Sequence, residues 1–176
     1  LGCCVRGALV DRWVSEFLTK HPNGTVIEAG CGLNTRFSRL DNGLATWVSV
    51  DLPDVIALRK KLVPTHPRVL ELVGSIADKS WLELVKRSTP GPWFVATEGV
   101  LMYLPKPDVV RTVQQISSLL TGGWFAFDVM TPIVLKMQQL HDAMKFFEAQ
   151  FISSVGSPHE VESWSDQLSI VQSESF

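Results

Sequence analysis

Two glycines and two carboxylates form the part of the sequence that is best suited to hold a ligand. Gly30 and Gly32 follow the apolar run 25–29 directly, and Glu28 lies two residues before Gly30. Glycine has no Cβ, so the backbone at such positions can approach a ligand closely. The negative charge of Glu28 beside them suits a cationic group, such as the sulfonium and ammonium of adenosylmethionine.

The second carboxylate, Asp51, ends another apolar run, residues 46–50, and follows Gly30 by 21 residues. An acidic side chain about 20 residues beyond a glycine turn typically accepts hydrogen bonds from the ribose hydroxyls of an adenosine. The alternative is that Asp51 caps the helix that begins at Pro53. The spacing favours ribose binding.

These features admit two classes of enzyme. A dinucleotide-dependent dehydrogenase requires a third glycine, which counting from Gly30 falls at position 35, where this chain has Thr35. Arg36 could still contact a phosphate, so a nicotinamide-dependent oxidoreductase stays open. A non-catalytic nucleotide-binding module is the third alternative. Glu28 favours adenosylmethionine.

Five short apolar runs predict the strands that position these residues. They span residues 25–29, 46–50, 69–73, 93–97 and 124–129, and helical patterns at 5–18, 37–40, 53–62 and 107–120, with a short helix capped by Asp78, separate them. Strands that are apolar throughout and alternate with helices predict an α/β fold with a doubly wound, mostly parallel sheet and helices on both faces. Such a sheet binds ligands at the carboxyl ends of its strands.

The tail follows a different pattern. Residues 132–151 carry apolar side chains at helical spacing, which predicts either a core-facing helix or a lid over a substrate pocket; these side chains are Ile133, Met137, Leu140, Met144, Phe147 and Phe151. Residues 168–171 are interpreted as a sixth strand.

Composition bounds the class of protein. The 176 residues suit one domain, 1–176, which we expect to be incomplete at both ends. A net charge of −2 without a basic run does not favour nucleic acid as a partner. Three cysteines and four scattered histidines predict neither a disulfide framework nor a metal site. The absence of a long apolar run predicts no membrane span, and we expect a cytoplasmic protein.

Three motifs give the sequence a resemblance to a known family. Residues 30–40 resemble the Gly-x-Gly-Leu-Asp-Thr-Arg-x-x-Arg-Leu motif of the leucine carboxyl methyltransferase family, a family of class I S-adenosylmethionine-dependent methyltransferases. Residues 50–56 resemble its Val-Asp-Leu-Pro-Glu-Val segment, and residues 98–105 its Glu-Gly-Val-Leu-x-Tyr-Leu segment. The chain departs from the first motif at Asn34, where the family usually has Asp.

The resemblance implies S-adenosyl-L-methionine as the cofactor and assigns residues to it. Arg6 would pair with the methionine carboxylate, Gly30 would line the methionine portion beside Gly32, and Glu98 would lie by the amino group. Asp51 would bind the ribose. Residues Ser75 and Ile76 would flank the adenine.

The resemblance also implies the reaction. The family contains enzymes that methylate a C-terminal leucine carboxylate of a protein and bacterial enzymes that O-methylate polyketides and other small molecules; this sequence is closer to the bacterial branch. We therefore expect an O-methyltransferase for a carboxylate or hydroxyl of a small molecule. Met102 and Tyr103 follow the strand that ends before Glu98 and could face that substrate. No residue stands out as a catalytic base.

Overall fold

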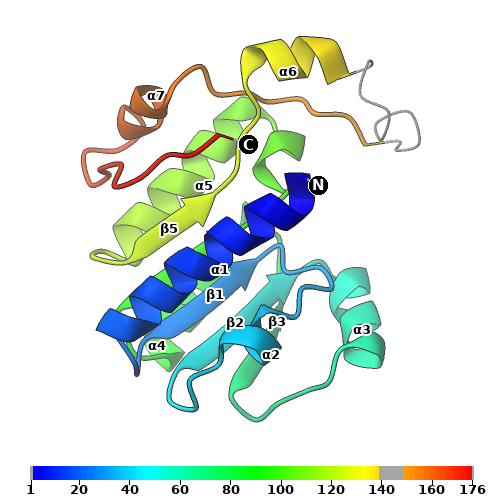
Figure 1. The fold of residues 1–176 in the computed structure, drawn as a ribbon, viewed down its shortest axis with the longest axis vertical. Helices are drawn as coiled ribbons and strands as arrows, with labels where there is room; N and C mark the ends of the chain where they lie inside the picture. Colours follow the sequence, from blue (N-terminus) through cyan, green and yellow to red (C-terminus); the bar gives the residue numbers. More distant parts are fainter. Residues whose placement is uncertain (1, 139–148, 176) are drawn as a thin grey trace.

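A five-stranded parallel sheet forms the centre of the molecule (Figure 1). The structure, a computed structural model, describes residues 2–138 and 149–175. Its strands are β1 (Thr25–Ala29), β2 (Thr46–Asp51), β3 (Val69–Val73), β4 (Trp93–Thr97) and β5 (Trp124–Phe127). They lie in the order β3-β2-β1-β4-β5, and every pair of neighbours is parallel. The predicted sheet is confirmed, although β5 ends two residues earlier than expected.

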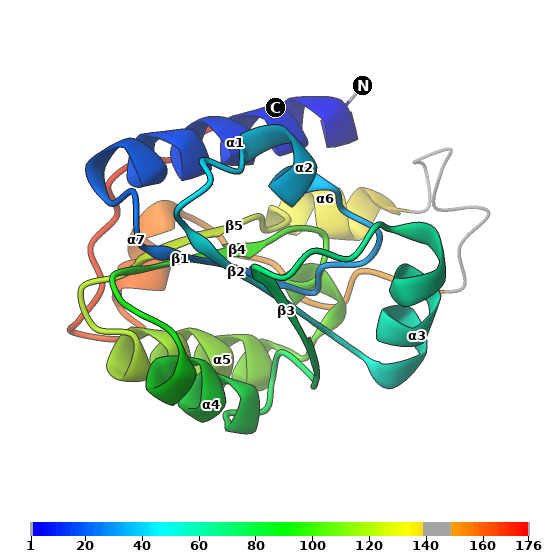
Figure 2. The ribbon, with the colours of Figure 1, turned by 90° about the horizontal axis from the view of Figure 1, so that it is seen from below.

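Helices cover both faces of this sheet, as predicted (Figure 2). On one face lie α1 (Gly2–Lys20) and α2 (Arg36–Leu40), and on the other lie α4 (Ser80–Ser88) and α5 (Lys106–Leu119). The helix α3 (Pro53–Leu62) lies beside the β3 edge. Three short helices complete the described chain: η1 (Leu101–Tyr103), α6 (Pro132–Met137) and α7 (Pro158–Glu162).

Two apolar cores explain why the strands are apolar throughout. All five residues of β1 are buried, because side chains of alternating direction enter a core on each face. Phe17 and Trp47 belong to the core beneath α1, whereas Leu82 and Val113 belong to the core beneath α4 and α5.

The strand order creates a switch between β1 and β4. The chain proceeds outward from β1 to β2 and β3, and then returns to the centre before it proceeds from β4 to β5. Glu28 of β1 therefore lies beside Ala96 of β4, although 68 positions separate them in the sequence. The loops after β1 and β4 diverge at this point, which leaves room for a ligand between them.

The predicted strand at 168–171 is wrong. These residues are irregular, and the N–H of Ile170 donates to the Glu162 carboxylate at 2.9 Å rather than to a neighbouring strand. Leu168 and Ile170 pack against the core beneath α5, whereas Val171 is 93% exposed. The apolar residues of this run are partly buried against the core beneath α5, and a carboxylate of α7 accepts the N–H of Ile170, so the pattern arises without a strand.

The predicted helix over 132–151 is confirmed only at its start. Its described part, α6, buries no residue, and Ile133 and Met137 are 65% and 50% exposed. The prediction that this part faces the core is therefore wrong. Residues 149–151 are not helical, and the positions between, with Leu140, Met144 and Phe147, lie outside the described residues.

Two smaller observations complete the fold. Asp78 does not cap α4: the helix begins after Lys79, and the Asp78 N–H donates to the Ser75 carbonyl in a turn. Across the described ranges 2–138 and 149–175, we find no helix with the length and apolar character needed to cross a bilayer.

Candidate functional site

An open cleft of about 340 Å³ lies at the carboxyl ends of β1 and β4. Pockets of a few hundred Å³ are typical of small-molecule and cofactor sites. Its walls come from α1, from β1 and the loop after it, from α2, and from β4 and the loop after it; the residues are Cys3, Arg6, Gly7, Glu28, Gly30, Cys31, Gly32, Asn34, Arg36, Arg39, Ala96 and Glu98. Four of the sequence-predicted cofactor residues therefore meet in one cleft: Arg6, Gly30, Gly32 and Glu98.

The glycine loop forms the floor of this cleft. Gly30 has a φ of 76°, and a Cβ at this position would come within 2.3 Å of a Val100 methyl group. Only glycine fits there, because both the backbone conformation and the close approach of Val100 exclude a side chain. Gly32 has a φ of 48° with open space around it. The glycine at position 30 is thus required by the fold before any ligand is considered.

Asp51 supports the loop from the neighbouring strand. Its Oδ2 accepts a hydrogen bond from the Gly32 N–H at 2.7 Å, and its Oδ1 accepts one from the Leu52 N–H at 2.8 Å. Leu52, not Asp51, is the residue that precedes the first turn of α3. A carboxylate oxygen can accept two hydrogen bonds, so each oxygen keeps a lone pair for a further donor.

Arg36 connects three carboxylates above the glycine loop. The side chain is only 1% exposed, and it contacts Asp11 on α1 at 2.6 Å, Glu28 on β1 at 2.9 Å and Glu98 after β4. Arg39 also pairs with Asp11, at 2.9 Å. Burial of a guanidinium is costly unless it is paired, and here three partners from three elements pair it.

Burial shifts the pKa values of this cluster. Desolvation raises the pKa of Glu28 to about 7, and the positive charges of Arg36 and Arg59 oppose the shift. For Asp11, hydrogen bonds from Arg39 and Arg36 outweigh its partial burial and lower the pKa. The cleft therefore contains a carboxylate, Glu28, whose charge depends on pH near neutrality.

Arg6 lies on the other side of Glu98. Its Nη1 donates to Asp128 Oδ2 at 2.9 Å, and its Nε lies 3.5 Å from Glu98 Oε2. Asp128, just after β5, also accepts a hydrogen bond from the Gly99 N–H at 2.7 Å through its other oxygen. One aspartate therefore holds both the Arg6 guanidinium and the loop that carries Glu98.

The remaining predicted residues lie outside the walls of the cleft. Ser75 and Ile76 follow β3, next to Asp51, whose carbonyl accepts a hydrogen bond from the Gly74 N–H. Ile76 is 6% exposed and belongs to the core. Met102 is 2% exposed and packs in the interior, whereas Tyr103 is 38% exposed and packs against Phe151.

Sequence reasoning missed Asp11, Asp128 and Arg59 as site residues. Asp11 lies on a helix far from the motif, and Asp128 directly follows β5, where a polar residue after an apolar strand was the available signal. Arg59 lies on α3, and its Nη1 donates to the carbonyls of Gly32 and Asn34. Asn34 itself accepts a hydrogen bond from the Arg36 N–H through Oδ1, so it supports the loop without a charge.

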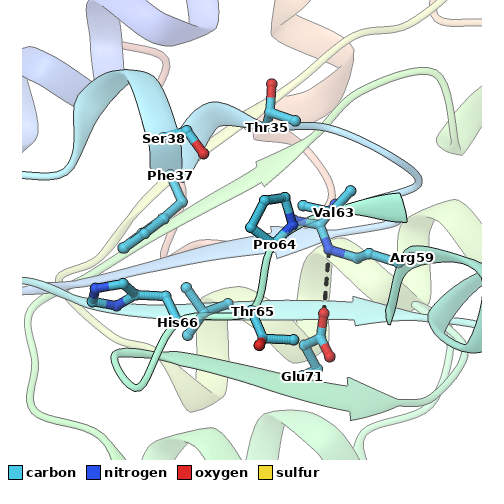
Figure 3. Close-up of a pocket in the computed structure, with 10 residues that line it drawn as sticks. Thr35, Phe37, Ser38, Arg59, Val63, Pro64, Thr65, His66 and Glu71 are labelled. Carbon is cyan, nitrogen blue, oxygen red and sulfur yellow. Dashed lines mark ion pairs between the residues drawn. The ribbon is translucent and has the colours of Figure 1, made fainter. Parts of the chain in front are cut away.

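A second, much smaller cavity lies between α2, α3 and β3 (Figure 3). Its volume of about 30 Å³ suits water rather than a cofactor. Phe37, His66, Arg59 and Glu71 are among the residues around it, and Arg59 pairs with Glu71. This cavity adjoins the support of the glycine loop and not its ligand-facing side.

Neither metal ligands nor disulfides are assembled in the described part of the chain. No group of three or more His, Cys, Asp or Glu side chains there could hold a metal ion. Cys3 and Cys4 are exposed and free, and Cys31 is buried and free. Burial raises the pKa of the Cys31 thiol to about 12, which keeps it protonated and unreactive at neutral pH.

Comparison with known proteins gives matches at both the sequence and the fold level. Residues 2–117 match the family model described as leucine carboxyl methyltransferase. The tetracenomycin polyketide synthesis O-methyltransferase TcmP of Streptomyces glaucescens is 31% identical over 159 residues, which cover 90% of this chain and 58% of that protein. The S-adenosyl-L-methionine-dependent methyltransferase dpfgK of Gibberella zeae is 28% identical over 64% of this chain and 40% of its own length. The chain thus spans about half the length of these relatives.

Solved structures show the same fold. An S-adenosylmethionine-dependent methyltransferase from Anabaena variabilis superposes with a TM-score of 0.65 and 13% identity, covering 93% of this chain and 73% of that one. An O-methyltransferase family protein from Burkholderia thailandensis gives 0.60 and 16% identity, covering 89% and 48%. At such low identity, the likeness concerns the class I methyltransferase architecture alone.

Proposed function

Since the chain belongs to the leucine carboxyl methyltransferase family, we propose that it binds S-adenosylmethionine in the cleft above β1 and β4 and transfers the methyl group to an oxygen of a small molecule. The observation that carries the proposal is the meeting of Arg6, Glu28 and Glu98 above the side-chain-free floor at Gly30. These residues come from three separate elements, and only the fold brings them together.

The charges of the cleft fit the amino-acid end of this cofactor. An amino acid presents one cation and one anion, and the cleft offers the carboxylates of Glu28 and Glu98 together with the guanidinium of Arg6. Gly30, whose positive φ favours glycine, leaves the floor without a side chain. Asp51 stands beside Gly32 with one free lone pair on each oxygen, which suits two hydroxyl donors such as those of a ribose.

The chemistry divides between cofactor and protein. The cofactor supplies an activated methyl group with a neutral leaving group, so the chain mainly needs to orient the acceptor and exclude water. Arg36 pairs with one oxygen of Glu28 and one oxygen of Glu98, and the second oxygen of each carboxylate remains for the ammonium group of the cofactor. A carboxylate acceptor is ionised at neutral pH and needs no base, whereas a phenol would benefit from one.

Exposed apolar side chains on η1 and α6 support an apolar acceptor, and we propose a polyketide-like molecule. Tyr103 packs on Phe151 with ring centroids 5.4 Å apart, and Gln138 exchanges two hydrogen bonds with the Phe151 main chain. Gln138 directly follows α6, whose Ile133 and Met137 are exposed. The TcmP relative, which is named for O-methylation in polyketide synthesis, supports the same class of acceptor.

Substitution of Asp51 tests cofactor binding. Loss of two charge-assisted hydrogen bonds in Asp51→Ala should weaken binding of S-adenosylhomocysteine by about 2–4 kcal/mol, or roughly 30- to 1,000-fold. Calorimetry on folded protein measures this effect, with Asp54→Ala as the matched control because Asp54 is an exposed carboxylate three residues away. Unchanged affinity in Asp51→Ala would remove Asp51 from the site. Binding of NAD with no binding of S-adenosylhomocysteine would instead support the oxidoreductase alternative.

A second assay addresses the acceptor. Wild-type protein with radiolabelled S-adenosylmethionine is offered an aromatic polyketide carrying carboxyl and phenol groups, and separately a peptide ending in leucine. We expect label in the polyketide. Label only in the peptide would reassign the acceptor to a protein carboxylate.

A further inference from the structure

Arg59 is a buried cation that contacts the back of the glycine loop. It extends from α3, is 2% exposed, and donates through Nη1 to the Gly32 carbonyl at 3.0 Å and to the Asn34 carbonyl at 2.6 Å. Asp51 holds the N–H of the same Gly32 at 2.7 Å. The peptide groups on both sides of Gly32 are therefore fixed by charged side chains, one on β2 and one on α3.

Glu71 on β3 fixes Arg59 in turn. The Arg59 Nε lies 3.6 Å from Glu71 Oε1, and the Glu71 side chain is 13% exposed (Figure 3). The Nε has no hydrogen-bond partner, although it is buried. Glu71 therefore acts on Arg59 mainly through its charge, and it helps to compensate the buried cation.

The charge of Arg59 also reaches the ligand side of the loop. It lowers the pKa of both Glu28 and Cys31, in opposition to their desolvation. Arg59 does not line the cleft itself. Its influence on a ligand must consequently pass through the loop conformation and through the ionisation of Glu28.

We propose that Arg59, supported by Glu71, is a positioning residue that fixes the loop over residues 32–34 and thereby sets the affinity of the cleft for the cofactor. The inference rests on the proposed function, since the cofactor is S-adenosylmethionine. A purely structural role would change stability and leave the affinity of the folded protein unchanged. A positioning role changes the affinity of the folded protein and raises KM for the cofactor more than it lowers kcat.

Four variants separate these roles. Arg59→Met keeps the length of the side chain but removes the donors, and we expect the Kd for S-adenosylhomocysteine to rise about tenfold or more. Arg59→Lys keeps a cation with three donors and should restore part of the affinity. Lys60→Met changes an exposed neighbour and should have no effect. Val113→Ala creates a cavity in the core beneath α5, and it should lower stability without changing Kd.

Calorimetry measures Kd, and urea unfolding confirms that each variant is folded at the temperature used. If wild type does not bind S-adenosylhomocysteine, the proposed function fails. If wild type binds it and Arg59→Met binds it equally well, or if Val113→Ala loses as much affinity as Arg59→Met, the inference fails.

Glu71→Gln provides the test if Arg59→Met does not fold. It retains Arg59 and removes only the opposing charge. We expect about a threefold rise in Kd and faster amide hydrogen exchange over residues 32–35. Unchanged Kd together with unchanged exchange in this variant would overturn the proposal.

Discussion

Arg36 has contacts in the folded protein that its position in the sequence does not predict. The sequence places it next to a glycine turn, where a phosphate contact is one interpretation, but the structure gives it the carboxylates of Asp11, Glu28 and Glu98. These partners lie 25, 8 and 62 positions away. Spacing in the sequence cannot reveal such contacts, because they depend on how α1, β1 and β4 converge.

Other residues of the candidate site could be predicted from the sequence. Gly30 and Gly32 could be predicted because the end of a parallel strand fixes where the next residue lies, whereas Glu98 was assigned by the resemblance to the family. Asp128 follows the same rule at β5, yet its contacts with Arg6 and Gly99 span 122 and 29 positions. The motif positions were therefore predictable, and the ion pairs between them were not.

The close contact between Gly30 and Val100 predicts that adding a single Cβ atom at position 30 lowers stability. Gly30→Ala should destabilise the protein by about 3 kcal/mol or more, because it combines a positive φ with overpacking against Val100. Gly32→Ala should cost only about 1–2 kcal/mol, since open space surrounds that position. Adding Val100→Ala to Gly30→Ala should recover part of the loss. Urea unfolding compares these three variants with wild type, and equal losses for the two single glycine variants would contradict the steric argument.

Among the elements, the strands were predictable and the C-terminal segments were not. Each strand is a short apolar run between polar turns, and burial on both faces requires that pattern. The run at 168–171 has a similar composition, but it packs on α5 as irregular chain because Glu162 takes up the N–H of Ile170. The apolar stripe of α6 does not face a core in the described residues, so the helical period alone did not reveal which surface it faces.

The segment over residues 153–171, which contains α7, covers α5. Val155, Val161 and Trp164 from this segment are buried in the same core as Val113 and Ile116 of α5. The Lys106 ammonium pairs with Glu160 at 2.5 Å and lies 4.7 Å from the centroid of the Trp164 ring. The contact therefore combines apolar burial with charge.

Trp164→Ala tests whether this cover stabilises the fold. We expect a loss of about 3 kcal/mol in the free energy of unfolding, because the side chain is 8% exposed and its removal leaves a cavity. Val171→Ala is the control within the same segment, since Val171 is 93% exposed, and it should change stability by less than about 0.5 kcal/mol. Similar values for the two variants in denaturant titrations would show that the segment does not contribute to the core.

For the whole molecule, Glu28 makes stability depend on pH. Burial raises its pKa from 4.5 to about 7, so the folded state binds this proton more tightly than the unfolded state between these values. The contribution of Glu28 to stability is therefore present at low pH and is lost as pH rises through about 7. The loss is about 3 kcal/mol at most, because one pKa unit corresponds to about 1.4 kcal/mol.

Glu28→Gln removes this titration. The difference in unfolding free energy, wild type minus variant, should fall as pH rises from about 4.5 to about 7, and other carboxylates largely cancel in that difference. Urea titrations at several pH values measure it. Glu83→Gln, at an exposed carboxylate on α4, provides the control for the loss of a surface carboxylate. A flat difference for Glu28→Gln would place its pKa near the ordinary value.

Because β1 and β4 are neighbours in the sheet, the candidate site combines residues from two portions of the polypeptide. Residues up to Val73 supply Arg6, Glu28 and the glycine loop, whereas Glu98 and Asp128 come from the portion that begins with β4. Neither portion alone contains the full set of charges, so we expect the proposed cofactor affinity only once both have joined. A substitution that weakens the pairing of β1 with β4, even one far from the cleft, should lower the apparent affinity by the fraction of molecules in which the two portions are not packed together.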